Sequence, residues 1–216
     1  MSEDFGPWWS VGSIVLLPVV RMLFRVRAEG IDHVPASGPG ILAFNHVSVL
    51  DGPALVVETS FRRRRALRFL VAAEVFDQPF SGRVLRAFDQ IPVHRGEQDE
   101  RALATAIETV RGGALAAIAP EGRVSDDVEA GLQRIRSGCA RIALPTGAPV
   151  IPVGIWGTQR RWPSRGPVWS GLWRRPPVAI VYGPAVHPHP EDDIDSFCVR
   201  VGAALEEQVL RARALA

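Results

Sequence analysis

Short apolar runs alternate with amphipathic helical patterns along most of this 216-residue chain. Runs such as 40–45 and 150–155 have the length of buried strands, whereas the apolar side chains of 97–111 share one helical face. Strands that alternate with helices of about 10–15 residues are typical of a largely parallel sheet with helices on its faces. We therefore expect a single α/β domain with a largely parallel, mixed sheet, because a chain of this length can bury one sizeable core. The expected strands are 24–30, 40–45, 67–73, 90–94, 114–119, 150–155 and 178–182, and the expected helices are 52–60, 80–87, 97–111, 132–145 and 191–213.

The N-terminal stretch 8–24, WWSVGSIVLLPVVRMLF, is apolar nearly all round a helix. Its helical length of about 25 Å is short of the ~30 Å hydrocarbon core of a bilayer. Acidic residues precede it and no small-residue cleavage site follows, so it does not resemble a signal peptide. Two tryptophans at its start and three arginines at and after its end suit a membrane interface. We expect residues 1–24 to form a hydrophobic, membrane-associating interfacial segment ahead of a domain that spans 25–216; a buried core helix is the alternative.

Arginine supplies every positive charge among the 25 basic side chains, and the net charge is only +2. Charge alone therefore gives no reason to expect a nucleic-acid partner, and any bound phosphate would be held by guanidinium groups. The basic run 62–65 is expected to be a turn, either solvated or facing an anionic partner. The loop 159–175 holds five arginines and three tryptophans, which suits anionic lipid headgroups. Stacking on single-stranded nucleic acid and simple packing over the core are the alternatives, and the N-terminal segment favours the membrane surface.

Several common catalytic motifs are absent from the sequence. There is no G-x-S-x-G elbow for a serine hydrolase, no H-E-x-x-H or C-x-x-C spacing for zinc, and no Walker loop. The glycines of 38–43 fit G-x-G-x-x-A, but they precede the strand, whereas a dinucleotide-binding fold needs them after it. Hydrolase, zinc and nucleotide chemistry are therefore unsupported, and no metal site is expected.

The segment 44–53, FNHVSVLDGP, ends an apolar strand on Asn45 and His46 and places Asp51 five residues after the histidine. Functional side chains of parallel sheets gather beyond the carboxyl ends of strands. If Asp51 accepts a hydrogen bond from one ring nitrogen of His46, the other nitrogen is free to act as a general base. Such a base would deprotonate a substrate hydroxyl, which would attack an activated acyl group directly. The structural alternative is that Asp51 N-caps a helix whose early Pro53 suits a start near this point.

Four ordered blocks of the chain resemble the motifs of the glycerolipid acyltransferases, the family typified by 1-acyl-glycerol-3-phosphate acyltransferase. The run NHVSVLD (45–51) matches the H-x4-D motif of that family, and IPVHRG (91–96), PEGRVS (120–125) and VIPVGI (150–155) resemble its second, third and fourth motifs. The similarity extends from about residue 24 to about residue 185. It implies acyl transfer from acyl-CoA or acyl carrier protein to a lysophospholipid-like acceptor, without a further cofactor, at the cytoplasmic face of the cell membrane.

The resemblance also implies the residues of the site. His46 would be the general base and Asp51 its orienting partner. The residues that would bind and enclose the acceptor's phosphate are Arg95, Arg123, Glu121 and Gly122.

The third block departs from the family pattern, because it has E-G-R-V-S where the family usually has E-G-T-R-S. Val124 therefore stands at the usual arginine position, and the arginine is displaced by one residue to position 123. This leaves the acceptor open: a glycolipid, an ornithine lipid or a polyketide alcohol would require the same chemistry. A non-catalytic lipid-binding protein is the alternative of a different class.

Overall fold

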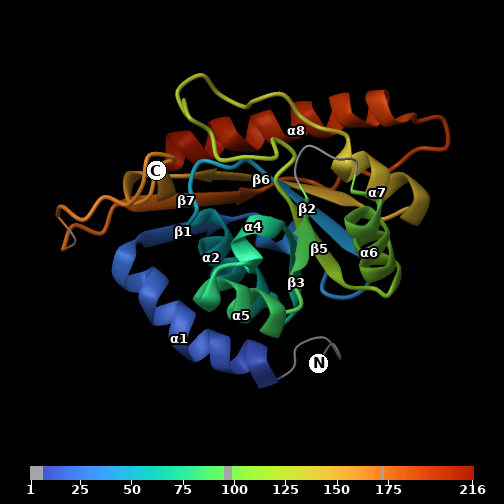
Figure 1. The fold of residues 1–216 in the computed structure, drawn as a ribbon. Helices are drawn as coiled ribbons and strands as arrows, with labels where there is room; N and C mark the ends of the chain where they lie inside the picture. The colour runs from blue at the N-terminus through green and yellow to red at the C-terminus, as the bar shows by residue number, and fades with distance from the viewer. Residues whose placement is uncertain (1–6, 95–98, 172) are drawn as a thin grey trace.

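The computed structural model describes residues 7–94, 99–171 and 173–216 (Figure 1). Its strands form one seven-stranded sheet in the order β1-β7-β6-β2-β5-β3-β4. Neighbouring strands run parallel except β6 and β7, which are antiparallel. The prediction of a single α/β domain with a largely parallel, mixed sheet is therefore confirmed. The strands are β1 Arg25–Glu29, β2 Gly40–Phe44, β3 Leu67–Ala72, β4 Ile91–Val93, β5 Leu115–Ile118, β6 Val150–Trp156 and β7 Pro177–Tyr182.

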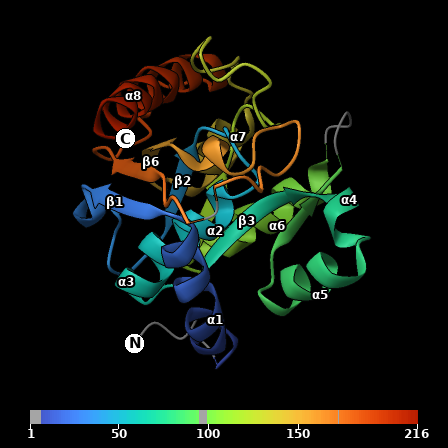
Figure 2. The same cartoon turned by 90° about the vertical axis from the view of Figure 1, so that its left-hand side faces the viewer.

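Helices cover both faces of the sheet, with α8 and α1 on opposite sides (Figures 1 and 2). Along β2, Ile41 and Ala43 pack with α6, α7 and α8, whereas Leu42 and Phe44 pack with α1 and α2. This is the two-residue alternation of a strand that is buried on both faces. The helices are α1 Pro7–Leu23, α2 Asp51–Leu55, α3 Phe61–Arg63, α4 Ala73–Phe76, α5 Pro79–Ala87, α6 Glu100–Arg111, α7 Gly138–Thr146 and α8 Ile194–Leu215, with a π-helical turn η2 at Val56–Ser60 and 3₁₀ turns η1 at Ile31–His33 and η3 at Thr158–Arg160.

The first helix, α1, buries one side and exposes the other. Trp9 and Val20 join the core cluster that includes α2 and β2, and the guanidinium of Arg21 donates to Glu58 at 3.0 Å. The opposite side exposes apolar residues, among them Ile14, which is 74% exposed. In the part of the chain that the structure describes, no helix combines the length and the apolar character needed to cross a bilayer.

One local expectation was wrong and another holds only in part. The helix expected over 132–145 begins at Gly138, because the backbone N–H groups of Gln133 and Arg136 bond to Glu121 and Pro120 instead of to a preceding turn. The basic run 62–65 is not simply a solvated turn, since Arg65 is only 2% exposed. Its guanidinium donates to the carbonyls of Pro35, Gly38 and Gly113 at 2.6–2.9 Å and so fastens the loops that enter β2 and β5.

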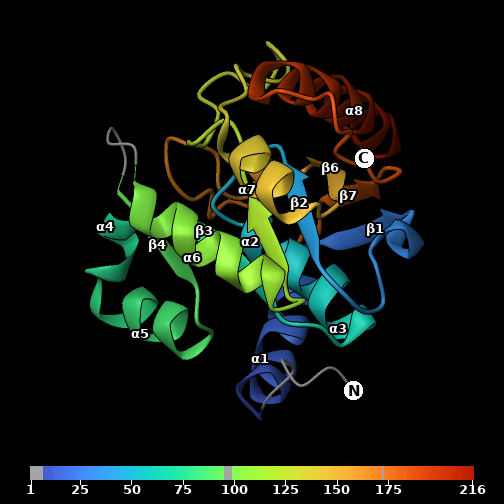
Figure 3. The ribbon, with the colours of Figure 1, turned by 90° about the vertical axis from the view of Figure 1, so that its right-hand side faces the viewer.

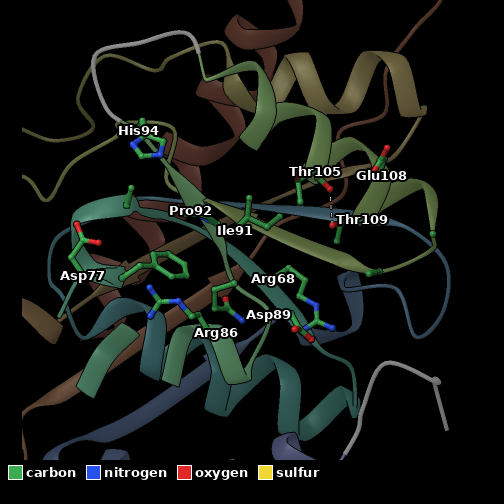
Figure 4. A pocket seen from close by; sticks show the side chains of 15 residues that line it. Arg68, Asp77, Arg86, Asp89, Ile91, Pro92, His94, Thr105, Glu108 and Thr109 are labelled. Carbon is green, nitrogen blue, oxygen red and sulfur yellow. Dashed lines mark hydrogen bonds and ion pairs between the residues drawn. The ribbon is translucent and has the colours of Figure 1, made fainter. Parts of the chain in front are cut away.

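Helices α4 and α5 flank the edge strand β4, with α6 crossing beside it (Figure 3). The short helix α4 was not expected from the sequence. This corner of the molecule holds a groove of about 770 Å³ whose walls include Arg86, His94 and Glu108 (Figure 4). One of its arginines, Arg68, is paired with Asp89 at 3.1 Å. The groove follows the sheet edge, and neither His46 nor Asp51 lines it.

Candidate active site

His46 lies beyond the carboxyl end of β2, in the tight turn that leads into α2, and Asp51 is the first residue of that helix. Nδ1 of His46 is 2.9 Å from Oδ2 of Asp51. Because a carboxylate only accepts hydrogen bonds, Nδ1 carries the proton of this pair and Nε2 keeps a free lone pair. The Asp51 side chain is fully buried, whereas the His46 side chain is 22% exposed. The imidazole can therefore meet a substrate while its carboxylate partner stays out of water.

Four donors surround the Asp51 carboxylate. Oδ2 also accepts the backbone N–H groups of Val47 and Ser48, each at 2.8 Å, and Oδ1 accepts the hydroxyl of Thr158 at 2.5 Å. The N-cap residue of α2 is the one before Asp51, and the described chain gives it no side-chain capping bond. The alternative that Asp51 N-caps this helix is therefore wrong. The carboxylate closes the turn that precedes α2 and meets the ring of His46.

Asn45 fixes the end of β2 against β6. Its side-chain amide donates to the carbonyl of Ile155 at 3.0 Å and accepts the N–H of the same residue at 2.7 Å. The side chain thus continues the ladder between the two strands by one step and prevents fraying at the point where the chain turns to His46. The Phe44 ring stands edge-on to the imidazole, with the two ring centres 5.9 Å apart.

Glu121 supports the backbone of His46. One oxygen of its carboxylate accepts the N–H of His46 at 2.7 Å, and the other accepts the N–H of Gln133 at 3.1 Å. The residue is 5% exposed. Burial raises the pKa of Glu121, and the hydrogen bonds from these two N–H groups partly oppose that rise. Both oxygens therefore accept backbone N–H groups, which indicates that Glu121 positions the turn that carries His46.

The chain between β5 and α7 is tied to the same turn. The N–H of Ser125 donates to the carbonyl of His46 at 2.7 Å. The Gln133 amide donates in turn to the hydroxyl of Ser125 at 2.9 Å. His46 therefore has both its backbone N–H and its backbone C=O bound to one neighbouring loop, and the positions of the ring and of that loop are linked.

The residues expected to bind the acceptor's phosphate make fewer contacts with one another than His46, Asp51 and Glu121 do. Gly122 has φ +75, and a Cβ placed there would lie 3.0 Å from Nε of Arg136. Arg123 is exposed, and its Nε reaches Oε1 of Gln133 only at 3.4 Å. Arg95 lies outside the described residues. The sequence reasoning did not single out Arg136, whose guanidinium packs on Gly122. Both residues lie in the connection between β5 and α7 that bonds to the backbone of His46.

Thr158 and Gln133 were also missed at the sequence level. Thr158 follows β6 by two residues, so the rule that drew attention to the strand end at His46 applies to it as well. Gln133 had no comparable signal, because it was expected inside a helix. Its contact with Glu121 arises only from the irregular path of the loop.

Comparison with known proteins shows which family the chain belongs to. Residues 25–156 match the family model described as Acyltransferase. The chain belongs to this family. The resemblance found in the four sequence blocks is thereby confirmed at the level of the family, and the matched region contains His46, Asp51, Glu121 and Gly122.

Two related proteins are similar to about three quarters of this chain. The chain is 30% identical over 176 residues to an uncharacterised protein of Mycobacterium leprae, which covers 74% of this chain and 45% of that protein. It is 23% identical over 167 residues to a chloroplastic 1-acyl-sn-glycerol-3-phosphate acyltransferase of Arabidopsis thaliana, which covers 76% of this chain and 44% of the plant protein. The chain thus spans about half the length of the curated relatives it matches.

A solved structure shares the fold. The 1-acyl-sn-glycerophosphate acyltransferase of Thermotoga maritima superposes with a TM-score of 0.76 at 23% identity, over 95% of this chain and 80% of that one. At this level of identity the likeness shows the fold.

Proposed function

We propose that this chain is an O-acyltransferase that moves a fatty acyl group from acyl-CoA or acyl carrier protein to the free hydroxyl of a lysophospholipid such as 1-acyl-glycerol-3-phosphate, in phospholipid biosynthesis. The observation that carries the proposal is the contact of 2.9 Å between Nδ1 of His46 and the buried Oδ2 of Asp51. Membership of the acyltransferase family supports the reaction class. The plant and Thermotoga relatives are described as acyltransferases of 1-acyl-glycerol-3-phosphate, and this supports the choice of acceptor.

The proposed reaction needs one base and no covalent enzyme intermediate. Nε2 of His46 takes the proton from the acceptor hydroxyl while the hydroxyl oxygen attacks the thioester carbonyl. Asp51 stabilises the imidazolium that forms, because its carboxylate faces Nδ1. When the tetrahedral intermediate collapses, the carbon–sulfur bond breaks and the thiolate takes the proton back from the imidazolium. The enzyme ends in its starting state with an ester and a free thiol as products.

Arginine side chains near the turn would bind the acceptor's anionic headgroup. Arg123 is exposed, and Arg136 packs on Gly122. All three residues lie in the connection between β5 and α7, which bonds to the backbone of His46. Guanidinium groups bind phosphate oxygens through paired N–H donors. We assign the same role to Arg95, because it stands in the block 91–96 that resembles the family's second motif. Because Val124 stands at the usual arginine position, the test of the acceptor must include substrates without phosphate.

We further propose that the protein works at the cytoplasmic face of the cell membrane as a peripheral or monotopic protein. The outer side of α1 exposes Trp8, Val11, Ile14 and Val15 by 51–74%. A contiguous apolar face of this kind is unusual on a protein surface that meets only water. The loop 159–175 contacts the chain at the other end of α1, where Arg175 donates to the carbonyl of Phe24 at 2.9 Å.

The acceptor is tested with a panel of substrates and one radiolabelled acyl-CoA. We expect the purified protein to acylate 1-acyl-glycerol-3-phosphate faster than a glycolipid, an ornithine lipid or a simple alcohol. Reaction only with acceptors that lack phosphate would contradict the headgroup assignment to Arg95, Arg123 and Arg136. A protein that binds lysolipid but transfers no acyl group from acyl-CoA or acyl carrier protein would contradict the enzymatic proposal.

Membrane docking is tested by sedimentation with vesicles of phosphatidylglycerol and phosphatidylcholine. Ile14→Asp places a charge in the exposed face of α1 and should lower the bound fraction severalfold, because burying a carboxylate in the interface is unfavourable. Val199→Asp is the matched control, since Val199 is 72% exposed on α8 on the opposite side of the sheet (Figure 1). Equal binding by the two variants would contradict docking through α1.

A further inference from the structure

Thr158 contacts the one carboxylate oxygen that His46 does not use. Its hydroxyl lies 2.5 Å from Oδ1 of Asp51, and both residues are fully buried. Oδ2 accepts the imidazole N–H and two backbone N–H groups. Because a carboxylate cannot donate, the Thr158 hydroxyl must be the donor. Among the described residues it is the one hydrogen-bond donor to Oδ1, so the compensation of that oxygen depends on it.

The chain around Thr158 is built to hold this hydroxyl in place. Gly157 has φ +107, and a Cβ there would lie 2.2 Å from the carbonyl oxygen of Pro177, so a side chain would strain the turn. The carbonyl of Thr158 accepts the N–H groups of Arg161 and Trp162 at 3.0 and 3.2 Å. The turn is therefore fixed from both sides of the threonine.

Arg161 extends this support into the loop that follows. Its side chain is nearly buried, at 6% exposure. It donates to the carbonyls of Ser170 and Gly171 at 3.1 and 2.8 Å, and also to that of Arg174. The loop 159–175 is thus folded back on the turn that carries Thr158, which limits the positions that the hydroxyl can take.

We propose that Thr158 is a positioning residue for the acyl transfer, acting on His46 through Asp51. This rests on the proposed function. The hydroxyl holds Oδ1, while Oδ2 is held by the imidazole and by two backbone N–H groups, and it neutralises part of the buried negative charge. Without it, Oδ1 loses this donor and the buried carboxylate is less well compensated, so it attracts the ring proton more strongly and favours the protonated imidazole. A base that is already protonated cannot accept the proton of the substrate hydroxyl.

Thr158→Val removes the hydroxyl and keeps the shape of the side chain. We expect kcat to fall about ten- to hundredfold, with the KM for the acceptor changed by less than about twofold, since Thr158 is fully buried behind Asp51. We also expect the acid limb of the profile of kcat/KM against pH to move to higher pH. Thr158→Ser keeps a donor and should restore both the rate and the profile to within about threefold of the unchanged protein.

Thr59→Val is the matched control, because Thr59 is a buried threonine whose hydroxyl bonds to the phenol oxygen of Tyr182 at 2.7 Å. Both valine variants lose one buried hydroxyl, and Thr158→Val should lose more thermal stability than Thr59→Val because its partner is a carboxylate. A purely structural hydrogen bond at Thr158 would give the two variants equal kcat and equal pH profiles. The proposal requires that only Thr158→Val changes them.

Several outcomes would overturn the proposal. Unchanged kcat and pH profile in Thr158→Val, an equal loss in Thr59→Val, or failure of Thr158→Ser to restore activity would each do so. If Thr158→Val does not fold, Thr158→Ala is measured instead, and wild-type kcat in that variant would count against the proposal. The proposed function fails separately, if the unchanged protein transfers no acyl group or if His46→Ala keeps full activity.

Discussion

Replacement of Glu121 by glutamine distinguishes support of the catalytic turn from direct contact with the acceptor. The carboxylate accepts the N–H of His46 at 2.7 Å and that of Gln133 at 3.1 Å. Glutamine offers one oxygen and one NH₂ group at these positions. Whichever way the amide is turned, one backbone N–H faces another donor. The variant therefore loses one hydrogen bond to a charged acceptor and leaves a buried N–H unpaired.

The size of the effect follows from these contacts. Losing a hydrogen bond to a charged group costs about 1.5–3 kcal/mol, and relief of the carboxylate's desolvation offsets part of it. We expect the free energy of unfolding to fall by about 2 kcal/mol near neutral pH. In a domain of about 150–250 residues this corresponds to a decrease in Tm of about 4–8 °C.

The assay combines thermal unfolding with steady-state kinetics. We expect Glu121→Gln to lower kcat about tenfold or more, because the backbone of His46 shifts, and to leave the KM for the acceptor nearly unchanged. Glu206→Gln, on the exposed side of α8, is the control and should change neither Tm nor kcat. A raised KM with an unchanged Tm would refute the reasoning, since it would mean that Glu121 binds the acceptor.

The same substitution has a defined dependence on pH. Burial raises the pKa of Glu121 above its ordinary value of 4.5, against the hydrogen bonds from His46 and Gln133 that lower it. The folded protein therefore keeps a proton on Glu121 at pH values where the unfolded chain has lost it. The pH-dependent part of its contribution to stability is fully present below 4.5 and is lost as the pH rises through the folded pKa, whereas the part that comes from the two backbone hydrogen bonds remains at neutral pH. The destabilisation by Glu121→Gln should accordingly be larger near pH 4.5 than near pH 8, as measured by urea unfolding at each pH.

Two further substitutions test the pair and the packing. Asp51→Asn removes the negative partner of His46 and places an amide where a pure acceptor is needed. We therefore expect kcat to fall at least about a hundredfold. A loss below about threefold in a direct rate assay would argue against an orienting carboxylate. Gly154→Ala sets a Cβ 2.1 Å from the backbone oxygen of Gln208 in α8, so thermal unfolding should show a loss of about 3 kcal/mol or more, whereas Gly112→Ala, with its nearest contact at 3.4 Å, should be nearly neutral.

Local pattern was sufficient to predict the sheet and the catalytic turn. The short apolar run of β2 is buried on both faces, as is typical of a strand in a parallel sheet, and its polar end marks the edge where His46 lies. Sequence spacing also predicted the contact between His46 and Asp51, because only a tight turn separates them. The direction of β7 against β6 did not follow from local pattern, since it depends on the path of the intervening loop.

Contacts between distant segments were beyond the sequence argument. Thr158 reaches Asp51, and Asn45 reaches Ile155, only after β6 has docked beside β2. The late start of α7 also depends on a distant contact, because the N–H of Gln133 bonds to the buried Glu121 and not to a carbonyl of a preceding helical turn. Here tertiary hydrogen bonding overrides local helix propensity.

The account depends most on His46 as the base that deprotonates the acceptor. The decisive measurement is the initial rate of acyl transfer from radiolabelled acyl-CoA to 1-acyl-glycerol-3-phosphate by His46→Ala, with the exposed His189→Ala as control. Removal of a general base should lower kcat by about 10²–10⁴ while the Tm stays close to that of the unchanged protein, and His189→Ala should keep the full rate. A folded His46→Ala variant that transfers acyl groups at the wild-type rate would contradict the mechanism.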